Sequence, residues 1–166
     1  MSLTFTYKIQ GEVVSTNTPL IPFMDNEYDR EAVIRLEKHL KSMPEADNGD
    51  GDVEHFFSDG LYARKLNIPA DTVLVGHAHL KGQINFLMKG TIRVTTDNGV
   101  KTLTAPQIVV SAAGTKRAGY AITDTTWVTV SATDETEPEA VRKAIIAESE
   151  DDPRLKEVLC LGQQQQ

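Results

Sequence analysis

Cysteine, aromatic residues and long apolar runs are all scarce in this chain of 166 residues. Cys160 is the only cysteine, so no disulfide can form within the chain, and a reducing compartment fits. No apolar run approaches the roughly 20 residues that span a bilayer, and the first ten residues lack the basic start and apolar stretch of an export signal. We therefore expect a cytoplasmic protein with no membrane partner.

The motifs of several common enzyme classes are absent as well. The sequence has no Gly-x-Ser-x-Gly nucleophile elbow, no Walker phosphate loop and no Gly-x-Gly-x-x-Gly. A net charge of −7 and the lack of a basic stripe with interleaved aromatics argue against nucleic acid as a partner. With 40% hydrophobic and 25% charged residues, the composition is typical of one globular domain with a proper core.

The charges that are present are unevenly distributed. Residues 60–133 hold eight Lys and Arg against three Asp, whereas the rest of the chain holds nine basic and 21 acidic residues. The centre of the chain is therefore cationic and its two ends are anionic. Two interpretations stay open: the centre receives an anion or the acidic ends of a neighbouring copy, or the ends are simply solvated by their acids.

The two ends of the chain are predicted to carry helices. Apolar residues recur at three- and four-residue steps over 29–43, with Asp29 as the expected N-cap. A second helix is expected over 136–148, capped by Thr136, and a short helix over 153–161. The apolar stripe of the first helix must cover either the outside of the central region or a partner subunit.

The rest of the N-terminal third has weaker patterns. Residues 1–14 alternate like a short strand at a sheet edge, and residues 16–23, with two prolines and no period, are expected to form a connecting arm. Residues 44–54 form an acidic segment whose aspartates do not match the calcium loop of an EF-hand from any starting point. We therefore expect a polar loop there rather than a calcium site.

From Leu61 onward the pattern changes to short alternating strands separated by turn signals. The pair Asn98-Gly99 predicts a tight hairpin, because both residue types tolerate positive φ. About eight short strands at regular spacing predict a β-sandwich or a barrel. The expected strands cover 61–68, 72–80, 84–88, 91–96, 100–103, 107–111, 117–122 and 126–132.

Two histidines one residue apart lie in the segment DTVLVGHAHLKGQINFLMKG, residues 71–90. Residues i and i+2 of a strand point to the same side of a sheet, so His77 and His79 can converge on one small volume. Two imidazoles at this spacing can bind one metal ion at about 2.0–2.1 Å. The alternative is a pair of ordinary polar residues on a half-exposed strand, and the spacing alone leaves both open.

This segment resembles the first sequence motif of the cupin superfamily of small antiparallel β-barrels, Gly-x5-His-x-His-x3/4-Glu-x6-Gly. His77 and His79 align with the two histidines, Gln83 with the glutamate and Gly90 with the closing glycine. Asp71 stands where the opening glycine belongs, which departs from the motif. The resemblance implies a metal site at His77, His79 and Gln83, in which an amide replaces the usual carboxylate.

The second cupin motif, Gly-x5-Pro-x-Gly-x2-His-x3-Asn, resembles residues 112–117. Ala112 replaces the proline, Gly114 is kept, and Arg117 stands at the last metal histidine. A shift of one residue in register would exchange Arg117 for Lys116. Because a guanidinium stays protonated, Arg117 at a ligand position would oppose a divalent cation. It could instead bind a carboxylate or a phosphate with bidentate geometry.

Two longer stretches, SDGLYARKLNIPADTVLVGH and GTKRAGYAITDTTWVTVSATDETE, resemble a group of cupin-like proteins of tailed bacteriophages and prophages that has no agreed activity. The resemblance implies a mainly β fold: a single cupin-type jelly-roll barrel at 60–133. Residues 1–59 would form an arm and helix packing on the barrel, and residues 134–166 a helical arm with a frayed tail.

Three functions remain open from the sequence. The degraded ligand set favours a non-catalytic phage-type barrel, an oligomeric virion structural or accessory protein. It would lie in the host cytoplasm or the virion, with further copies or other phage proteins as partners. The second is a metal-dependent isomerase or oxygenase acting on a small polar substrate, so the expected cofactor is none or a weakly held divalent transition metal. The third is a binding module for a small anionic ligand, with Arg117 as its anchor.

Overall fold

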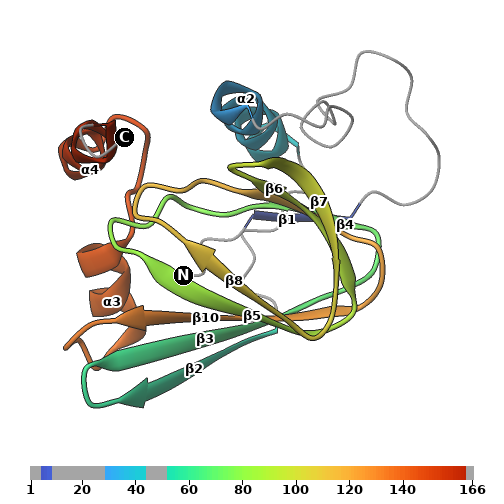
Figure 1. The fold of residues 1–166 in the computed structure, drawn as a ribbon, viewed down its shortest axis with the longest axis horizontal. Coiled ribbons are helices and arrows are strands. Elements are labelled where there is room, and N and C mark those ends of the chain that lie inside the picture. Colours follow the sequence, from blue (N-terminus) through green and yellow to red (C-terminus); the bar gives the residue numbers. More distant parts are fainter. Residues whose placement is uncertain (1–4, 9–28, 44–51, 164–166) are drawn as a thin grey trace.

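Two five-stranded antiparallel sheets face each other and form a flattened barrel, with helices along its outside (Figure 1). The structure is a computed structural model that describes residues 5–8, 29–43 and 52–163. It confirms the expected mainly β, jelly-roll type barrel with flanking helices. Sheet A has the order β1 (Phe5–Lys8), β4 (Thr72–Val75), β9 (Ala118–Ala121), β6 (Thr91–Thr96) and β7 (Gly99–Thr104). Sheet B has the order β2 (Val53–Ser58), β3 (Leu61–Ile68), β10 (Thr125–Ala132), β5 (Gln83–Lys89) and β8 (Gln107–Ser111).

Most strands lie where the sequence predicts them. Strands β3 to β10 all fall within the region 61–132, and β1 pairs with β4 at the edge of sheet A. The expected hairpin joins β6 to β7, and Gly99 adopts the positive φ of 91° that the turn requires. The structure does not describe residues 44–51 of the acidic loop or the connecting arm at 16–23.

Strand β2 was not predicted, and its first residues belong to the segment expected to be an acidic loop. It pairs with β3 from Val53 opposite Leu66 to Ser58 opposite Leu61. Its pattern is hard to recognise because the face that looks out of the barrel carries Phe56, which is 50% exposed, while the inward face carries His55. Val53 shares the inward face with His55, and Glu54 shares the outward face with Phe56, so each face of the strand mixes apolar and polar side chains.

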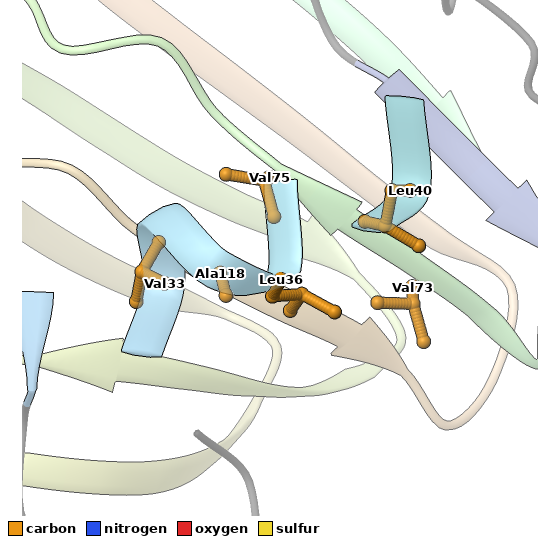
Figure 2. Packing of buried hydrophobic residues seen from close by; sticks show 6 residues of the cluster. All are labelled: Val33, Leu36, Leu40, Val73, Val75 and Ala118. Carbon is orange, nitrogen blue, oxygen red and sulfur yellow. The ribbon is translucent and has the colours of Figure 1, made fainter. Parts of the chain in front are cut away.

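Helix α2 (Arg30–Lys41) covers the outer face of sheet A, as expected for the first amphipathic segment. Asp29 is its N-cap and accepts a hydrogen bond of 2.9 Å from the backbone N–H of Glu31. Each fully buried aliphatic side chain in this contact contributes about 1.5–3 kcal/mol. The contact, shown in Figure 2, joins Val33, Leu36 and Leu40 of the helix to Val73, Val75 and Ala118 of the sheet.

A cluster of charged side chains joins α2 to the β8–β9 loop and to the C-terminal segment by ion pairs and a hydrogen bond. The side chain of Lys116 is only 4% exposed, and its Nζ lies 3.1 Å from Oε2 of Glu37 and 3.6 Å from Oε1 of Glu150. Arg30 pairs with Glu150 at 3.0 Å and donates a hydrogen bond of 2.7 Å to the carbonyl of Gly114. The cluster links the helix, the β8–β9 loop and the C-terminal segment.

The C-terminal helices are α3 (Pro138–Ile145) and α4 (Pro153–Gln163). The expected cap at Thr136 is wrong: the N-cap is Glu137, which makes no side-chain cap hydrogen bond. Pro138 takes the first helical position, where a missing N–H needs no partner, so the helix starts one residue later than that cap implies. None of the helices in the described part of the chain is long and apolar enough to cross a membrane.

Helix α3 is fixed over one end of the barrel. Val141 and Ile145 pack on Tyr62 of β3. The backbone N–H of Leu80 donates to the carbonyl of Ile145 at 2.7 Å, and that of Ala147 donates to the carbonyl of Ala78 at 3.0 Å. The segment that carries the two histidines is therefore joined directly to the end of this helix.

Candidate functional site

A cavity of about 540 Å³ lies between the two sheets and is bordered by α3 at one end. Its volume falls within the roughly 300–1,000 Å³ typical of small-molecule sites. The lining comes from the inward positions of both sheets, because alternate residues of a strand share a face. Tyr62, Arg64 and Leu66 of β3, for example, all line the cavity.

The two ends of this cavity differ in chemistry. Register places Tyr62 opposite Ser131, close to where the chain leaves β10 toward α3, and Ile68 opposite Thr125 at the other end. We call the end beside α3 the polar end; its lining includes His55, Tyr62, Arg64, His77, His79, Gln83 and Arg142. We call the opposite end the apolar end; its lining includes Leu66, Ile68, Leu74, Ile92, Val94 and Trp127.

The two histidines reach the cavity from an irregular segment and not from a strand. The prediction of one strand over 72–80 is wrong: β4 ends at Val75, and the backbone of His79 instead forms an isolated bridge with Ile146. The change of partner follows from β9, whose pairing with β4 ends at Ala118 opposite Val75. His77 and His79 nevertheless line the same cavity.

Both histidines are held in the neutral form. Burial, followed by the positive charge of Lys116, lowers the pKa of His77 to about 4. Burial, followed by the positive charge of Arg64, lowers the pKa of His79 to about 4. At neutral pH each imidazole is therefore uncharged, with one nitrogen as an N–H donor and the other as an acceptor.

Gln83 begins β5 and faces inward beside the histidines. Among the residues that the structure describes, neither Oε1 of Gln83 nor Nδ1 of His79 has a hydrogen-bond partner, although both atoms are buried. Buried polar atoms in folded proteins are nearly always paired, and leaving one unpaired costs about 1–3 kcal/mol. These two atoms are therefore candidates to bind a ligand or ordered water.

Arg117 also lines the cavity. Lys116, the residue that a shift of one position in the second motif would put in its place, lies instead in the ion cluster under α2. The guanidinium of Arg117 is held by neutral oxygens: Nε donates to Oγ of Ser111 at 3.2 Å and Nη1 donates to the carbonyl of Thr95 at 2.7 Å. These bonds hold Arg117 against the wall formed by β6 and β8.

Arg64 is a second arginine that lines the cavity, and it lies outside both sequence motifs. Its positive charge lowers the pKa of His79, after burial, and that of His55, again after burial. Beside it, Nδ1 of His55 and the hydroxyl of Tyr62 lie 2.7 Å apart and share a hydrogen bond. The alternation of Tyr62, Arg64 and Leu66 in a predicted strand could have placed this arginine on the inner face.

Residues 77, 79 and 83 do not fit a tightly bound divalent metal. The donor set is two neutral imidazoles and one amide oxygen, without a carboxylate, and the described residues contain no group of three or more His, Cys, Asp or Glu that could hold a metal ion. The charge of Arg64 that disfavours an imidazolium at His79 also repels a divalent cation, whereas the charge of Lys116 is opposed by Glu37 and Glu150. The charge of Arg64 favours an anion.

The comparisons with known proteins concern the fold alone. No family model matches the chain, and no curated protein matches it. Solved structures similar to part of it include KdgF from a Halomonas species, at 13% identity and TM-score 0.45, with 52% of this chain and 81% of that chain covered. A cupin-2 domain protein from Shewanella frigidimarina aligns at 10% identity and TM-score 0.42, with 50% and 81% covered.

An acetylacetone dioxygenase from Acinetobacter johnsonii is also similar, at 18% identity and TM-score 0.41, with 48% of this chain covered. The alignment spans only 58% of the length of that dioxygenase. The similar structures thus include proteins described as cupins and a protein described as a dioxygenase. At these identities and TM-scores the likeness carries no argument about activity or substrate.

Proposed function

We propose that this protein is a binding barrel for a small organic anion, the third of the functions that the sequence leaves open. The single observation that carries the proposal is the position of Arg64 beside His79 and Gln83, at the polar end of a cavity of about 540 Å³. A carboxylate or phosphate there would accept bidentate hydrogen bonds from the arginine. The amide and the neutral imidazole would supply weaker polar contacts.

The cavity lining also contains two glutamates, Glu137 and Glu139, against three arginines, Arg64, Arg117 and Arg142. Glu139 lines the cavity, yet it lies 3.5 Å from Nη1 of Arg142, an arginine of the same helix. Arg117, which also lines the cavity, donates hydrogen bonds to two neutral oxygens, Oγ of Ser111 and the carbonyl oxygen of Thr95. The lining therefore combines at least two arginine charges with neutral histidines, which supports an anionic ligand.

A thermal-shift screen of small carboxylates and phosphate monoesters tests the proposal. We expect at least one compound class to raise the melting temperature of the wild type, and Arg64→Gln to lose most of that increase. Arg35→Gln is the matched control, since the side chain of Arg35 is 60% exposed on α2 and far from the cavity lining. Equal protection of both variants, or no protection by any anion, would overturn the proposal.

A second candidate function is assembly, and the outer face of sheet B favours it. Pairing aligns outward residues straight across the strands, and no described helix covers this face. One row is apolar across all five strands, and the next is apolar on β10, β5 and β8 and continues on β3 and β2 with the ion pair of Lys65 and Glu54. An exposed apolar face of this extent is typical of an interaction site. The first row is Phe56, Ala63, Val130, Ile84 and Val110, and the second contains Val128, Phe86 and Ile108.

We propose a second copy of this chain as the partner of that face, in line with the oligomeric structural or accessory role, in a phage particle or outside one, that the sequence favours. Val110 is 73% exposed, so Val110→Lys should not disturb folding. We expect light scattering at micromolar concentration to give a defined oligomer for the wild type and smaller particles for Val110→Lys. Thr102→Lys on exposed β7 of sheet A is the control. A monomeric wild type would exclude this candidate.

A further inference from the structure

The apolar end of the cavity determines which anions the site can accept. Along β3, the lining residues change from Tyr62 and Arg64 at the polar end to Leu66 and Ile68 at the apolar end. Arg64 and Ile68 are four residues apart, which is about 13 Å at roughly 3.3 Å per residue. A ligand anchored at Arg64 therefore has several carbon atoms' length of apolar wall available to it.

The wall formed by sheet A is also apolar at this end of the cavity. Leu74 of β4, with Ile92 and Val94 of β6, lines the cavity from sheet A. Gly119 of β9 also lines it, and a Cβ at that position would lie 3.3 Å from Cδ1 of Ile92 and 3.4 Å from Cδ2 of Leu74. The glycine therefore leaves open the space between these side chains. Leu74, Ile92 and Val94 offer a polar ligand no hydrogen-bonding group.

On the opposing wall, formed by sheet B, the side chain of Asn85 is fully paired with its neighbours. Oδ1 of Asn85 accepts hydrogen bonds from Nε1 of Trp127 at 3.2 Å and from Oγ1 of Thr129 at 2.8 Å. Nδ2 of the same asparagine donates to the carbonyl of Val109 at 3.2 Å and to Oγ of Ser111 at 3.1 Å. All hydrogen-bonding atoms of the Asn85 side chain are therefore used within the protein, and none is left for a ligand. Toward the apolar end, the main feature of this wall is the ring of Trp127.

From this arrangement we infer that the ligand is an amphiphilic acid: a carboxylate or phosphate head beside Arg64, His79 and Gln83, and an apolar body extending toward Trp127 and Ile92. The inference rests on the proposed anion-binding function and specifies its ligand class. A short, wholly polar anion would leave the apolar end unfilled, and a neutral hydrocarbon would leave the buried Nδ1 of His79 and Oε1 of Gln83 without a hydrogen-bond partner.

The fluorescence of Trp127 can report whether a ligand reaches the apolar end of the cavity. Trp127 is the only tryptophan, and it lines the apolar end of the cavity. Its emission will respond to a ligand whose body reaches that end. The probes are butyrate, hexanoate and octanoate, with octyl phosphate as the alternative head group and octanol as the uncharged body.

We expect the dissociation constant measured through Trp127 emission to fall about fourfold for each added methylene, the factor that corresponds to about 0.8 kcal/mol per buried CH₂. We expect octanol to bind at least tenfold more weakly than octanoate. Arg64→Gln should weaken octanoate at least tenfold and leave octanol unchanged, while Arg35→Gln should change neither. Arg64→Lys, which keeps the charge but not the bidentate geometry, should lie between wild type and Arg64→Gln.

The failures of the inference and of the proposed function are distinguishable. If inorganic phosphate or acetate binds as tightly as octanoate, or affinity does not depend on chain length, the ligand is not amphiphilic but the anion site stands. If octanoate and octanol bind equally, and Arg64→Gln weakens neither, the cavity is an apolar site and both proposals fall. Octyl phosphate binding more tightly than octanoate would support the inference and assign the head group as phosphate.

Discussion

The indole N–H of Trp127 donates a hydrogen bond of 3.2 Å to Oδ1 of Asn85, from one strand of sheet B to its neighbour. This contact fixes the ring of Trp127 within the cavity wall. Asn85 is 2% exposed, and its side chain makes four hydrogen bonds in all. It accepts from Trp127 and Thr129, and it donates to Val109 and Ser111. It is therefore the residue on which the shape of this wall depends.

Replacing Asn85 by Leu should destabilise the protein, because its buried neighbours would lose their partners. Each such orphaned group costs about 1–3 kcal/mol, so we expect the free energy of unfolding to fall by roughly 2–4 kcal/mol in urea denaturation. The emission maximum of Trp127 should shift in the native state as well. An unchanged emission spectrum and stability would show that the hydrogen bonds to Asn85 do not hold the indole.

Removing Glu37 should loosen α2 from the barrel. Although burial raises the pKa of Glu37, the charges of Lys116 and Lys41 outweigh it and hold the pKa below its ordinary value. We expect Glu37→Gln to cost about 3 kcal/mol, near the lower end for a broken buried pair, because Glu150 still faces Lys116. Lys41→Gln, which breaks a more exposed pair with the same carboxylate, should cost less than about 1 kcal/mol. Equal effects of the two variants in urea denaturation would contradict this assignment.

The two cavity histidines predict a specific pH dependence of stability. The pKa of each is about 4 in the folded protein and about 6.5 in the unfolded chain, so the unfolded state binds more protons between these values. Stability should therefore fall as the pH is lowered from 7 to 5, by about 2 kcal/mol for each histidine. His79→Gln should remove about half of this dependence, as measured by urea denaturation at several pH values. Resonances of His77 or His79 that titrate near pH 6.5 in NMR spectra would refute the prediction.

The donor set also predicts a protein without a resident transition metal. Elemental analysis of protein purified from metal-supplemented cells should find well below one equivalent of transition metal per chain, because the donor set has no carboxylate and Arg64 opposes a divalent cation beside His79. About one equivalent that disappears in His79→Ala would support the metal-dependent enzyme that the cupin resemblance implies, and would count against an anion site.

The sequence was sufficient to predict the barrel, because its strands are short and their turns carry clear signals. Gly99 closes a hairpin, and Gly90, with a φ of 87°, ends β5 where the sequence places a turn. Strand β2 was missed because both of its faces mix apolar and polar side chains: Val53 and His55 line the cavity, and Phe56 faces outward. Local periodicity cannot show which face of a strand looks inward when the interior itself is polar.

The candidate site was only partly predictable, for a related reason. A motif fixes spacing along one segment, so it selected His77, His79, Gln83 and Arg117, all of which line the cavity. Arg64 joins them only through the pairing of β3 with β10 and of β10 with β5, which sequence spacing does not reveal. The ion cluster that takes Lys116 out of the cavity likewise depends on where α2 packs.

A crystal structure of the wild-type protein with 8-bromooctanoate bound would test the central claim most directly, because the anomalous signal of bromine locates the end of the apolar body. The account predicts one molecule per chain inside the barrel, with the carboxylate against Arg64 and the bromine beside Trp127 and Ile92. A molecule bound in the reverse orientation, or found only outside the cavity, would contradict it.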